Sequence, residues 1–585
     1  SSQTYDLIII GGGTSGLTLA GRLSTLLPHH RLLVLERGHN ESTNPLIHIP
    51  GKFGEALSSP LNYGYTTTPQ KHLDNRVLDL GAGRMLGGTS ALNFLIWHSG
   101  CGAEYDVWEA LGNKGWNGRE MMRAIRKIEG FVDNEEHDGV KAVRKERHGV
   151  EGPLKTGFAG WYPPNTTPKL AQAYEKNGVA YTPDPMGGQN EGMTFTVMTV
   201  DPKRYTRTTS QTAFEALQTG NVDVLTGATV ARVVLEDVEG QENLVATGVE
   251  FLDEEDNKWV VGLKQGGEVV VCGGYVQSPK ILELSGIGKR EVLEKTGVPV
   301  KVENPNVGEN LQDHQFVHLS FEHAPGEITR DRIMTDPNWA KKQMELYQSS
   351  RTGFYTGAGA PVAVISLNKI MSSEEIAALS QKYGTPSDLN RVDMDPFLSN
   401  ALPRHDTPPA PQIEILMPPW KISSLFEAEE GKTYTTFTPV LMHPLGRGSV
   451  HIRSSNPHDH PDIDLGFYSH PLDKEVMIAA LKFAAKVTET EPLAGALKRR
   501  MTPREGELTD EEWWEHIKRD THSAQHAIGS CSMLPRDKGG VVDDRARVYG
   551  VKGLRVCDGS IAPLHFSAHS QATIYGMAEL VAEKI

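Results

Sequence analysis

The chain has 585 residues and is 38% hydrophobic, and its 59 lysines and arginines against 74 aspartates and glutamates give a net charge of −15 at pH 7. A chain of this length and composition predicts a soluble globular protein with several lobes. The absence of a basic stripe argues against nucleic acid as a partner. No run approaches the ~18 apolar residues that a membrane-spanning helix needs, which argues against a membrane protein.

The first elements of the chain have the pattern of a nucleotide-binding unit. Residues 5–10 form a short β-branched run typical of a buried strand, and a G-x-G-x-x-G motif follows at residues 11–16. Apolar residues at helical spacing occupy residues 17–27. A second apolar strand at residues 32–35 ends at Glu36, about 20 residues after the last glycine, where a carboxylate can accept hydrogen bonds from ribose hydroxyls.

Each residue of the glycine motif has a physical role in this interpretation. Gly11 permits the tight turn, Gly13 lets a pyrophosphate approach the backbone, and Gly16 lets helix and strand pack closely. Thr14 and Ser15 open the helix, whose N-terminal N–H groups and positive dipole end favour phosphates. The fragment therefore predicts a dinucleotide site, and it leaves NAD and FAD equally open.

Five later segments, taken with the glycine motif, resemble the glucose–methanol–choline (GMC) family of FAD oxidoreductases. They follow the order of the family's motifs and extend over almost the whole chain. The resemblance implies FAD as the cofactor. The segments are residues 81–112, 272–288, 306–314, 526–533 and 554–580.

The resemblance also implies an α/β architecture, with a Rossmann-like FAD-binding domain and a second, sheet-and-helix substrate-binding domain. The motifs enclose a middle that lacks nucleotide-site features. We therefore expect a discontinuous FAD-binding domain of residues 1–155, 221–320 and 516–585, and a substrate-binding domain of residues 156–220 and 321–515.

The family's FAD contacts fall on identifiable positions of this chain. Members that bind FAD covalently carry a histidine just before the asparagine of the first segment, where this chain has Leu92, so non-covalent FAD is predicted. Val230 matches the position whose backbone pairs with adenine. Besides Gly11, Gly13, Thr14, Ser15, Gly16 and Glu36, the expected FAD contacts are Arg84, Gly88, Thr89, Asn93, Phe94, Leu95, Val230, Asp558, Gly559, His569, Gln571 and Ala572.

Oxidation of an alcohol by hydride transfer needs a base for the hydroxyl proton and a group that aligns the substrate. By resemblance, His526 and His569 occupy the two active-site positions of the family. We predict His526 as the base and His569 as the partner that holds the alkoxide. Glu414 matches a carboxylate that orients the second histidine in some members. The helix after His569 would direct its positive end at the flavin.

Four residues are candidates for the substrate pocket: Phe94, Trp97, Leu416 and His522. Glucose-specific members tend to carry an arginine at the position of His522 and an aromatic residue at the position of Leu416. This difference favours a less polar primary alcohol, aryl or similar to a secondary metabolite, and the fungal branch of the family. The flavin would be reoxidised by oxygen or by a quinone, and the sequence leaves that choice open.

Three other functions remain as alternatives at this point. The first is a glucose-type sugar oxidase or dehydrogenase. The second is a hydroxynitrile lyase that holds a flavin without using its redox chemistry. The third is a catalytically silent flavin-binding protein, which the presence of both His526 and His569 argues against.

The cysteines and histidines show no metal-ligand spacing, so no metal site is predicted, and His458, His460 and His470 are interpreted as loop residues. The sequons at Asn40 and Asn165 permit glycosylation if the protein is exported. The first residues contain no charged-then-apolar leader, so we expect that a signal peptide was removed or never existed. A secreted or secretory-pathway protein is expected, and a cytoplasmic location stays open.

Overall fold

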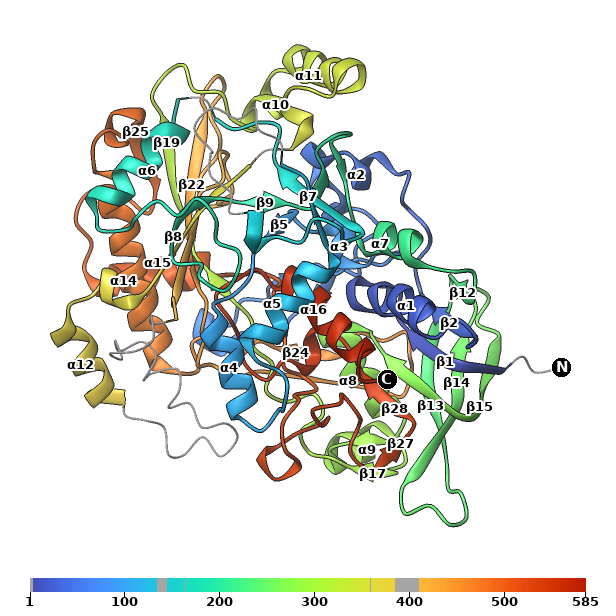
Figure 1. The fold of residues 1–585 in the computed structure, drawn as a ribbon. Coiled ribbons are helices and arrows are strands. Elements are labelled where there is room, and N and C mark those ends of the chain that lie inside the picture. The colour runs from blue at the N-terminus through green and yellow to red at the C-terminus, as the bar shows by residue number, and fades with distance from the viewer. Residues whose placement is uncertain (1–3, 134–144, 164, 358, 384–409) are drawn as a thin grey trace.

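The computed structural model describes residues 4–133, 145–163, 165–357, 359–383 and 410–585. Two large sheets dominate the mixed α/β fold (Figure 1). Strands from the N-terminus and the middle of the chain form the first sheet, on the side of Figure 1 where the N-terminus lies. The second sheet, with β19 and β22, lies on the opposite side. No helix of the described ranges is both long and apolar enough to cross a bilayer.

The first sheet has a parallel core in the strand order β12-β2-β1-β15, extended by β14 and β13 in antiparallel orientation. In its centre, Ile8 of β1 lies between Leu33 of β2 and Val269 of β15. Such apolar strands suit a sheet that is buried on both faces. The strands of this sheet are β1 (Thr4–Ile10), β2 (Leu32–Leu35), β12 (Val222–Leu225), β13 (Thr229–Glu236), β14 (Leu244–Leu252), β15 (Lys258–Val271), β27 (Val551–Lys552) and β28 (Leu554–Val556).

Helices from distant parts of the sequence pack together beside this sheet. Helix α1 contacts both α7 and α16, and α16 also contacts α5. Arg22 of α1 forms a two-pronged ion pair with the buried carboxylate of Glu579 on α16, with an N···O distance of 2.7 Å. The helices of this side are α1 (Thr14–Leu26), α4 (Gly102–Ala110), α5 (Gly118–Ile128), α7 (Ser210–Leu217), α8 (Gly274–Leu284), α9 (Arg290–Thr296) and α16 (Ser570–Ala582).

The second sheet is antiparallel, in the order β25-β19-β22-β21-β20-β8, with β18 pairing both β22 and β26. Helix α14 contacts β22 and is packed in turn against α15 and α6. The strands are β8 (Gly192–Phe195), β18 (Gln315–Phe316), β19 (Leu319–His323), β20 (Pro361–Ile365), β21 (Ile413–Leu416), β22 (Tyr434–Leu441), β25 (Leu497–Thr502) and β26 (His522–Ser523). The helices are α6 (Thr167–Lys176), α10 (Asp331–Thr335), α11 (Pro337–Ser350), α12 (Ser373–Tyr383), α14 (Pro471–Thr488) and α15 (Asp510–Asp520).

Smaller elements complete the fold. A four-stranded sheet in the order β5-β9-β7-β6 combines strands from both predicted lobes. Its strands are β5 (Ile96–Trp97), β6 (Glu129–Phe131), β7 (Leu154–Phe158) and β9 (Val197–Met198). The remaining short elements are β3 (Tyr65–Thr66), β4 (Asp79–Leu80), β10 (Val200–Asp201), β11 (Thr206–Arg207), β16 (Ile287–Gly288), β17 (Val302–Glu303), β23 (Ser449–His451), β24 (Asp462–Asp464), α2 (Pro45–His48) and α3 (Thr89–Leu92).

The packing differs from the predicted lobe boundaries at several elements. Helix α7 lies in the segment 156–220 that was predicted for the substrate lobe, yet it packs on α1, and Ser210 donates to the carbonyl of Gly13. Strand β23 likewise contacts α8 of the nucleotide side. Conversely, β18 and β26 lie in segments that were predicted for the FAD-binding domain, yet both strands belong to the second sheet. Each of these short elements follows its hydrogen-bonding and packing partners, which lie far away in sequence.

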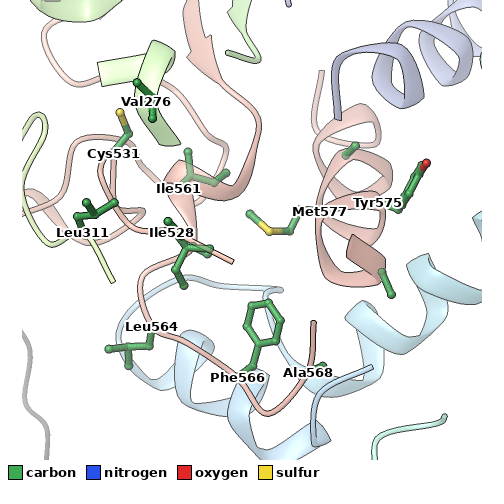
Figure 2. Packing of buried hydrophobic residues seen from close by; sticks show 14 of the residues in the cluster. Val276, Leu311, Ile528, Cys531, Ile561, Leu564, Phe566, Ala568, Tyr575 and Met577 are labelled. Carbon is green, nitrogen blue, oxygen red and sulfur yellow. The ribbon is translucent and has the colours of Figure 1, made fainter. Parts of the chain in front are cut away.

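One large hydrophobic core runs through both sides of the molecule. Figure 2 shows part of it, where Ile528, Ile561 and Phe566 gather near Met577 of α16. These residues belong to the last 60 residues of the chain, which pass from the first sheet to the terminal helix. The C-terminal segment is therefore held by apolar burial against the nucleotide side.

Candidate functional site

The first cavity, of about 180 Å³, lies at the carboxyl ends of the parallel strands of the first sheet. In open α/β sheets this edge is where nucleotides bind. Ten of the residues predicted for FAD line it. They are Gly11, Gly13, Thr14, Ser15, Glu36, Gly88, Thr89, Val230, Asp558 and Gly559.

The three motif glycines meet different surroundings. Gly11 has a φ of +105°, and a β-carbon there would lie 2.5 Å from the carbonyl oxygen of Cys272. A β-carbon on Gly16 would lie 1.9 Å from the carbonyl oxygen of Gly11, so no side chain fits between helix and strand. On Gly13 the nearest atom is 3.9 Å away, the α-carbon of Gly88. Gly13 therefore leaves backbone open to the cavity, as a bound pyrophosphate requires.

Helix α1 presents an uncapped N-terminus at this edge, because Gly13 supplies no capping side chain. Its first N–H groups are available to an anion, and the helix dipole favours negative charge there. Thr14 and Ser15, the first two residues of the helix, both line the cavity. This end of the helix has the chemistry that a diphosphate needs.

Two buried carboxylates frame the first cavity. Glu36 accepts hydrogen bonds from the backbone N–H groups of Gly12 and Gly38 at 2.8 and 2.7 Å, and burial raises the pKa of its carboxyl in spite of these bonds. Asp558 accepts from the N–H of Gly274 and the hydroxyl of Ser278. Each carboxylate thus shapes a turn of the cavity wall and keeps lone pairs for further donors.

A second cavity, of about 390 Å³, adjoins the first. Thr14, Thr89, Gln525, Ser570 and Ile574 line both cavities, so the two spaces share a wall. The volume suits a small organic molecule. The predicted site residues on its lining are Thr14, Thr89, Asn93, Phe94, Leu95, Glu414, Leu416, His522, His526, His569 and Gln571.

His526 and His569 face one another at this cavity, with ring centroids 4.5 Å apart. Nε2 of His569 lies 2.8 Å from the buried carboxylate of Glu414 on β21, so the ring donates its proton to Glu414. The backbone N–H of His569 donates to Nε2 of His98 at 2.9 Å. The structure thus brings the three residues predicted for catalysis into one cluster and adds His98 to them.

The cluster has a defined charge pattern. Burial lowers the pKa of His526 well below 6.5, and the neighbouring histidines His569, His314 and His98 lower it further. Burial also lowers the pKa of His98 to about 4, against the opposing charge of Glu414. The pKa of Glu414 lies below 4.5, because contact with His569 outweighs the effect of burial. At neutral pH the cluster therefore contains a neutral His526 and an ionised Glu414.

Asn93 follows α3 and is held by three contacts. Its Nδ2 donates to Oε1 of Gln571 at 2.7 Å, and its Oδ1 accepts from the N–H of Leu95 and from Nη1 of Arg207, each at 2.9 Å. Arg207 is buried, and burial lowers the pKa of its guanidinium to about 9. Arg207 thus fixes the amide orientation of Asn93 at the junction of the two cavities.

The terminal helix α16 also opens at this junction. His569 precedes its first turn without capping it by a side chain, and Ser570 lines both cavities. The positive end of the helix dipole is therefore directed at the shared wall. The positions of α1 and α16 place two uncapped helix N-termini around one space.

Four predicted site residues lie outside both cavities, and one of them is Gly16, which lies where helix α1 packs closely against the backbone of Gly11. Arg84 donates from Nη2 to the carbonyl of Pro60. Trp97 is fully buried against Tyr575, because side chains alternate along β5 and it is Ile96 that faces the cavity. Ala572 is fully buried on the inner face of α16, although the preceding two residues line the cavity. A helix turns each successive side chain by about 100°, which carries Ala572 away from the cavity.

The sequence analysis did not single out His98, His314 or Arg207. His98 and His314 both stand inside motifs that carried the family resemblance. For His98 the sequence also held a signal, because a polar residue directly after an apolar run can indicate a site residue. Arg207 is followed by a run of hydroxyl residues that gave no such signal. Their roles depend on contacts with residues distant in the sequence.

Two groups of histidine and carboxylate ligand atoms within the described residues lie close enough to hold a metal ion, and their ligand atoms fall within 4.8 Å of one another. One is the cluster of His98, Glu414 and His569. The other contains His318, Asp520 and His522, where the backbone N–H and Nδ1 of His318 contact the carboxylate of Asp520. In both groups a histidine already satisfies the carboxylate by a hydrogen bond.

Comparison with known proteins identifies the family. Two family models, both described as GMC oxidoreductase, match residues 5–316 and 444–578. The chain therefore belongs to the GMC oxidoreductase family and is an FAD-dependent oxidoreductase. This confirms the family and the α/β fold expected from the motifs.

Similar proteins cover the chain from end to end. The dehydrogenase mpl7 of Monascus purpureus is 30% identical over 99% of this chain and 96% of its own length. The dehydrogenase xptC of Emericella nidulans is 30% identical over 100% of this chain and 93% of its own. An FAD-dependent oxidoreductase from Chaetomium thermophilum is 27% identical, with a TM-score of 0.88 and 99% coverage of both chains.

The residues present fit FAD. The open backbone at Gly13, the free N–H groups of α1 and the carboxylate of Glu36 suit a diphosphate and a ribose at the first cavity. The shared wall between the cavities would then receive the flavin ring, with Asn93 and the start of α16 beside it. The second cavity is left for a substrate.

The glycine motif yields a matched pair of substitutions. We expect Gly13→Ala to leave the apoprotein folded and to weaken FAD binding by about 10- to 100-fold, since the new methyl group enters only the cofactor space. Gly16→Ala should instead lower the stability of the apoprotein by about 1–3 kcal/mol, because its methyl group collides with backbone. Thermal unfolding of the apoprotein and flavin titration separate the two effects. Equal losses of stability in both variants would contradict this assignment.

Proposed function

We propose that this protein oxidises the CH–OH group of a primary alcohol, aryl or similar to a secondary metabolite, to the carbonyl. The observation that carries the proposal is the position of His526, whose Nε2 has no hydrogen-bonding partner among the described residues and whose ring lines the second cavity. FAD, when bound, supplies the hydride acceptor. The residues of the chain supply the base, the orientation of the alcohol and the electrostatics.

His526 suits the role of base because it is neutral. Its lowered pKa keeps a lone pair on the ring at neutral pH, and the ring can take the hydroxyl proton of the alcohol at Nε2. In that step the O–H bond of the alcohol breaks and an N–H bond forms. Loss of the proton makes the oxygen an alkoxide, which expels the hydride more readily than the alcohol does.

His569 suits the role of partner because Glu414 fixes its ring. The bond from Nε2–H to the ionised carboxylate leaves Nδ1 of His569 without a hydrogen-bonding partner among the described residues. The ring centroids of His569 and His526 lie 4.5 Å apart. A carboxylate behind a histidine orients the ring and stabilises its charged form. The pair can thus hold an alcohol oxygen between them while the proton moves to His526.

The lining of the second cavity supports a substrate with an apolar body. Alkyl and aromatic side chains form a large part of it, beside the histidines and several hydroxyl and amide groups. Leu416 and His522 stand where glucose-specific members have an aromatic residue and an arginine, and both line the cavity. The apolar lining residues include Leu57, Phe94, Phe316, Leu416, Ile422 and Val440.

Two further expectations extend the proposal beyond the site. Asn40 and Asn165 are both exposed, which supports glycosylation at the two sequons in an exported protein. We also propose that oxygen or a quinone accepts the electrons from the flavin. A panel of alcohols assayed with oxygen and with a quinone-type dye distinguishes the two acceptors.

We propose that FAD is held without a covalent bond. Leu92, at the position of the covalent histidine in other members, ends α3 and has only an alkyl side chain, which cannot bond to the flavin. Acid precipitation of the holoprotein should therefore release all flavin into the supernatant. Yellow colour retained in the washed pellet would contradict non-covalent binding.

The proposed reaction is tested by anaerobic mixing of the holoprotein with benzyl-type alcohols, other primary alcohols and glucose. We expect aryl alcohols to bleach the flavin, and His526→Ala to retain FAD while its turnover falls by about 10²- to 10⁴-fold. A flavin that stays yellow with every alcohol, together with cleavage of a cyanohydrin, would identify a lyase instead. Bleaching by glucose alone would identify a sugar oxidase or dehydrogenase.

The charge pattern predicts the pH dependence of the reaction. His526 must be neutral to accept a proton, and its pKa lies well below 6.5, so the requirement is met at neutral pH and is lost only as the pH falls through that lowered value. Glu414 stays ionised over the same range. We expect kcat/KM for a non-ionising alcohol to be level between pH 8 and 6.5, with its acid limb below 6.5. An acid limb centred at or above 6.5 would rule out this base.

A further inference from the structure

His314 lies behind His526, on the side away from the second cavity. It is fully buried and directly precedes β18, whose residues Gln315 and Phe316 pair with β26. The N–H of Ala524 donates to the carbonyl of His314 at 2.8 Å, which continues this pairing toward His526. The two rings meet edge to face, with Nδ1 of His314 3.0 Å from Nδ1 of His526.

The contacts of His314 determine where its proton is. Its Nε2 lies 3.0 Å from the carbonyl oxygen of Met442. A carbonyl oxygen can only accept a hydrogen bond, so Nε2 of His314 carries the hydrogen. In the neutral ring Nδ1 then has a lone pair and accepts from Nδ1–H of His526. His526 is left with its own lone pair on Nε2, the atom that has no hydrogen-bonding partner in the described ranges of the chain.

We propose that His314 is a positioning residue, which fixes the tautomer of His526 so that the Nε2 lone pair is offered to the alcohol. This inference rests on the proposed function, in which His526 is the base. Two hydrogen bonds form a chain, in which His526 donates to His314 and His314 donates to the carbonyl of Met442. A hydrogen bond to one imidazole nitrogen is the usual means by which a protein selects the reactive state of the other.

The opposite tautomer of His526 is disfavoured by the same geometry. It would set two nitrogen lone pairs against one another at 3.0 Å inside the protein, and it would leave a buried acceptor unsatisfied. The backbone of His526 is held in place as well, because its N–H donates to Oδ1 of Asp313 at 2.9 Å. Asp313 and His314 thus hold the backbone and the ring of His526 together.

His314 must stay neutral for this arrangement, and its surroundings favour the neutral form. Burial lowers its pKa well below 6.5, and the nearby histidines lower it further. The ring of His565 stacks on it with centroids 3.7 Å apart. The titratable groups around the His314–His526 pair are Asp313, Glu414, His98, His443, His565 and His569.

The arrangement also serves the state after proton transfer. When Nε2 of His526 has taken the alcohol proton, both ring nitrogens carry hydrogen and the ring is positively charged. The bond from Nδ1–H to His314 then becomes a charge-assisted hydrogen bond, which is stronger than a neutral one. His314 therefore stabilises the charge that forms on the base as the O–H bond breaks.

The test compares two substitutions of His314, each of which keeps one of its two hydrogen bonds. His314→Asn places an amide oxygen near the position of Nδ1 and retains an acceptor for His526. His314→Gln reaches the position of Nε2, retains a donor for the Met442 carbonyl and loses that acceptor. With an aryl alcohol that the wild type oxidises, we expect kcat to fall about 100-fold in the Gln variant and less than about 10-fold in the Asn variant. KM and flavin content should change by less than about threefold in both, because neither group touches the alcohol.

His314→Leu, which removes both polar contacts, should be at least as slow as the Gln variant. His323→Leu is the matched control, since His323 is also buried and does not line either cavity, and its kcat should equal that of the wild type. Equal kcat values in the Asn and Gln variants, or wild-type kcat in the Leu variant, would overturn the role of His314. If His526→Ala itself stays active, the proposed base is wrong; if only that variant is inactive, the base stands and the inference about His314 fails.

Discussion

The site depends on the contact between the two ends of the chain. Helix α1 follows the first strand, α16 ends the protein, and their packing is secured by the ion pair between Arg22 and the buried carboxylate of Glu579. A buried carboxylate needs such a partner, because an uncompensated charge in the interior is strongly destabilising. This packing brings two uncapped helix N-termini to one space, and with them the residues that line both cavities.

From this constraint follows the separation of tasks in the site. The first cavity is built by glycine backbone and carboxylates that shape turns, so it suits the polar part of FAD. The second cavity combines an apolar lining with one cluster of histidines. Within that cluster the two facing rings have different partners: His569 donates to a carboxylate, whereas His526 donates to a neutral imidazole. The difference gives one ring a fixed orientation and leaves the other with a free lone pair, which the proposed oxidation of an alcohol would use.

Much of the fold could be predicted from the sequence, because strand, glycine turn and helix follow one another within the first 36 residues. The candidate site was predictable where motifs contained it, as for Asn93, His526 and His569. Position in a motif did not reveal that Arg84, Trp97 and Ala572 line neither cavity, while their neighbours along the chain do. The alternation of a strand and the rotation of a helix decide which side chain faces a site, and one residue of offset reverses the outcome.

By itself the sequence determined the glycine turn, the apolar strands of the first sheet and the motifs of the GMC family, because each is a property of residues close together in the chain. Only the tertiary structure decided that α7 belongs beside α1, that Arg207 holds Asn93, and that His98 and His314 flank the two facing histidines. These contacts join residues more than 100 positions apart. Their geometry depends on the packing of the whole core, which no local pattern encodes.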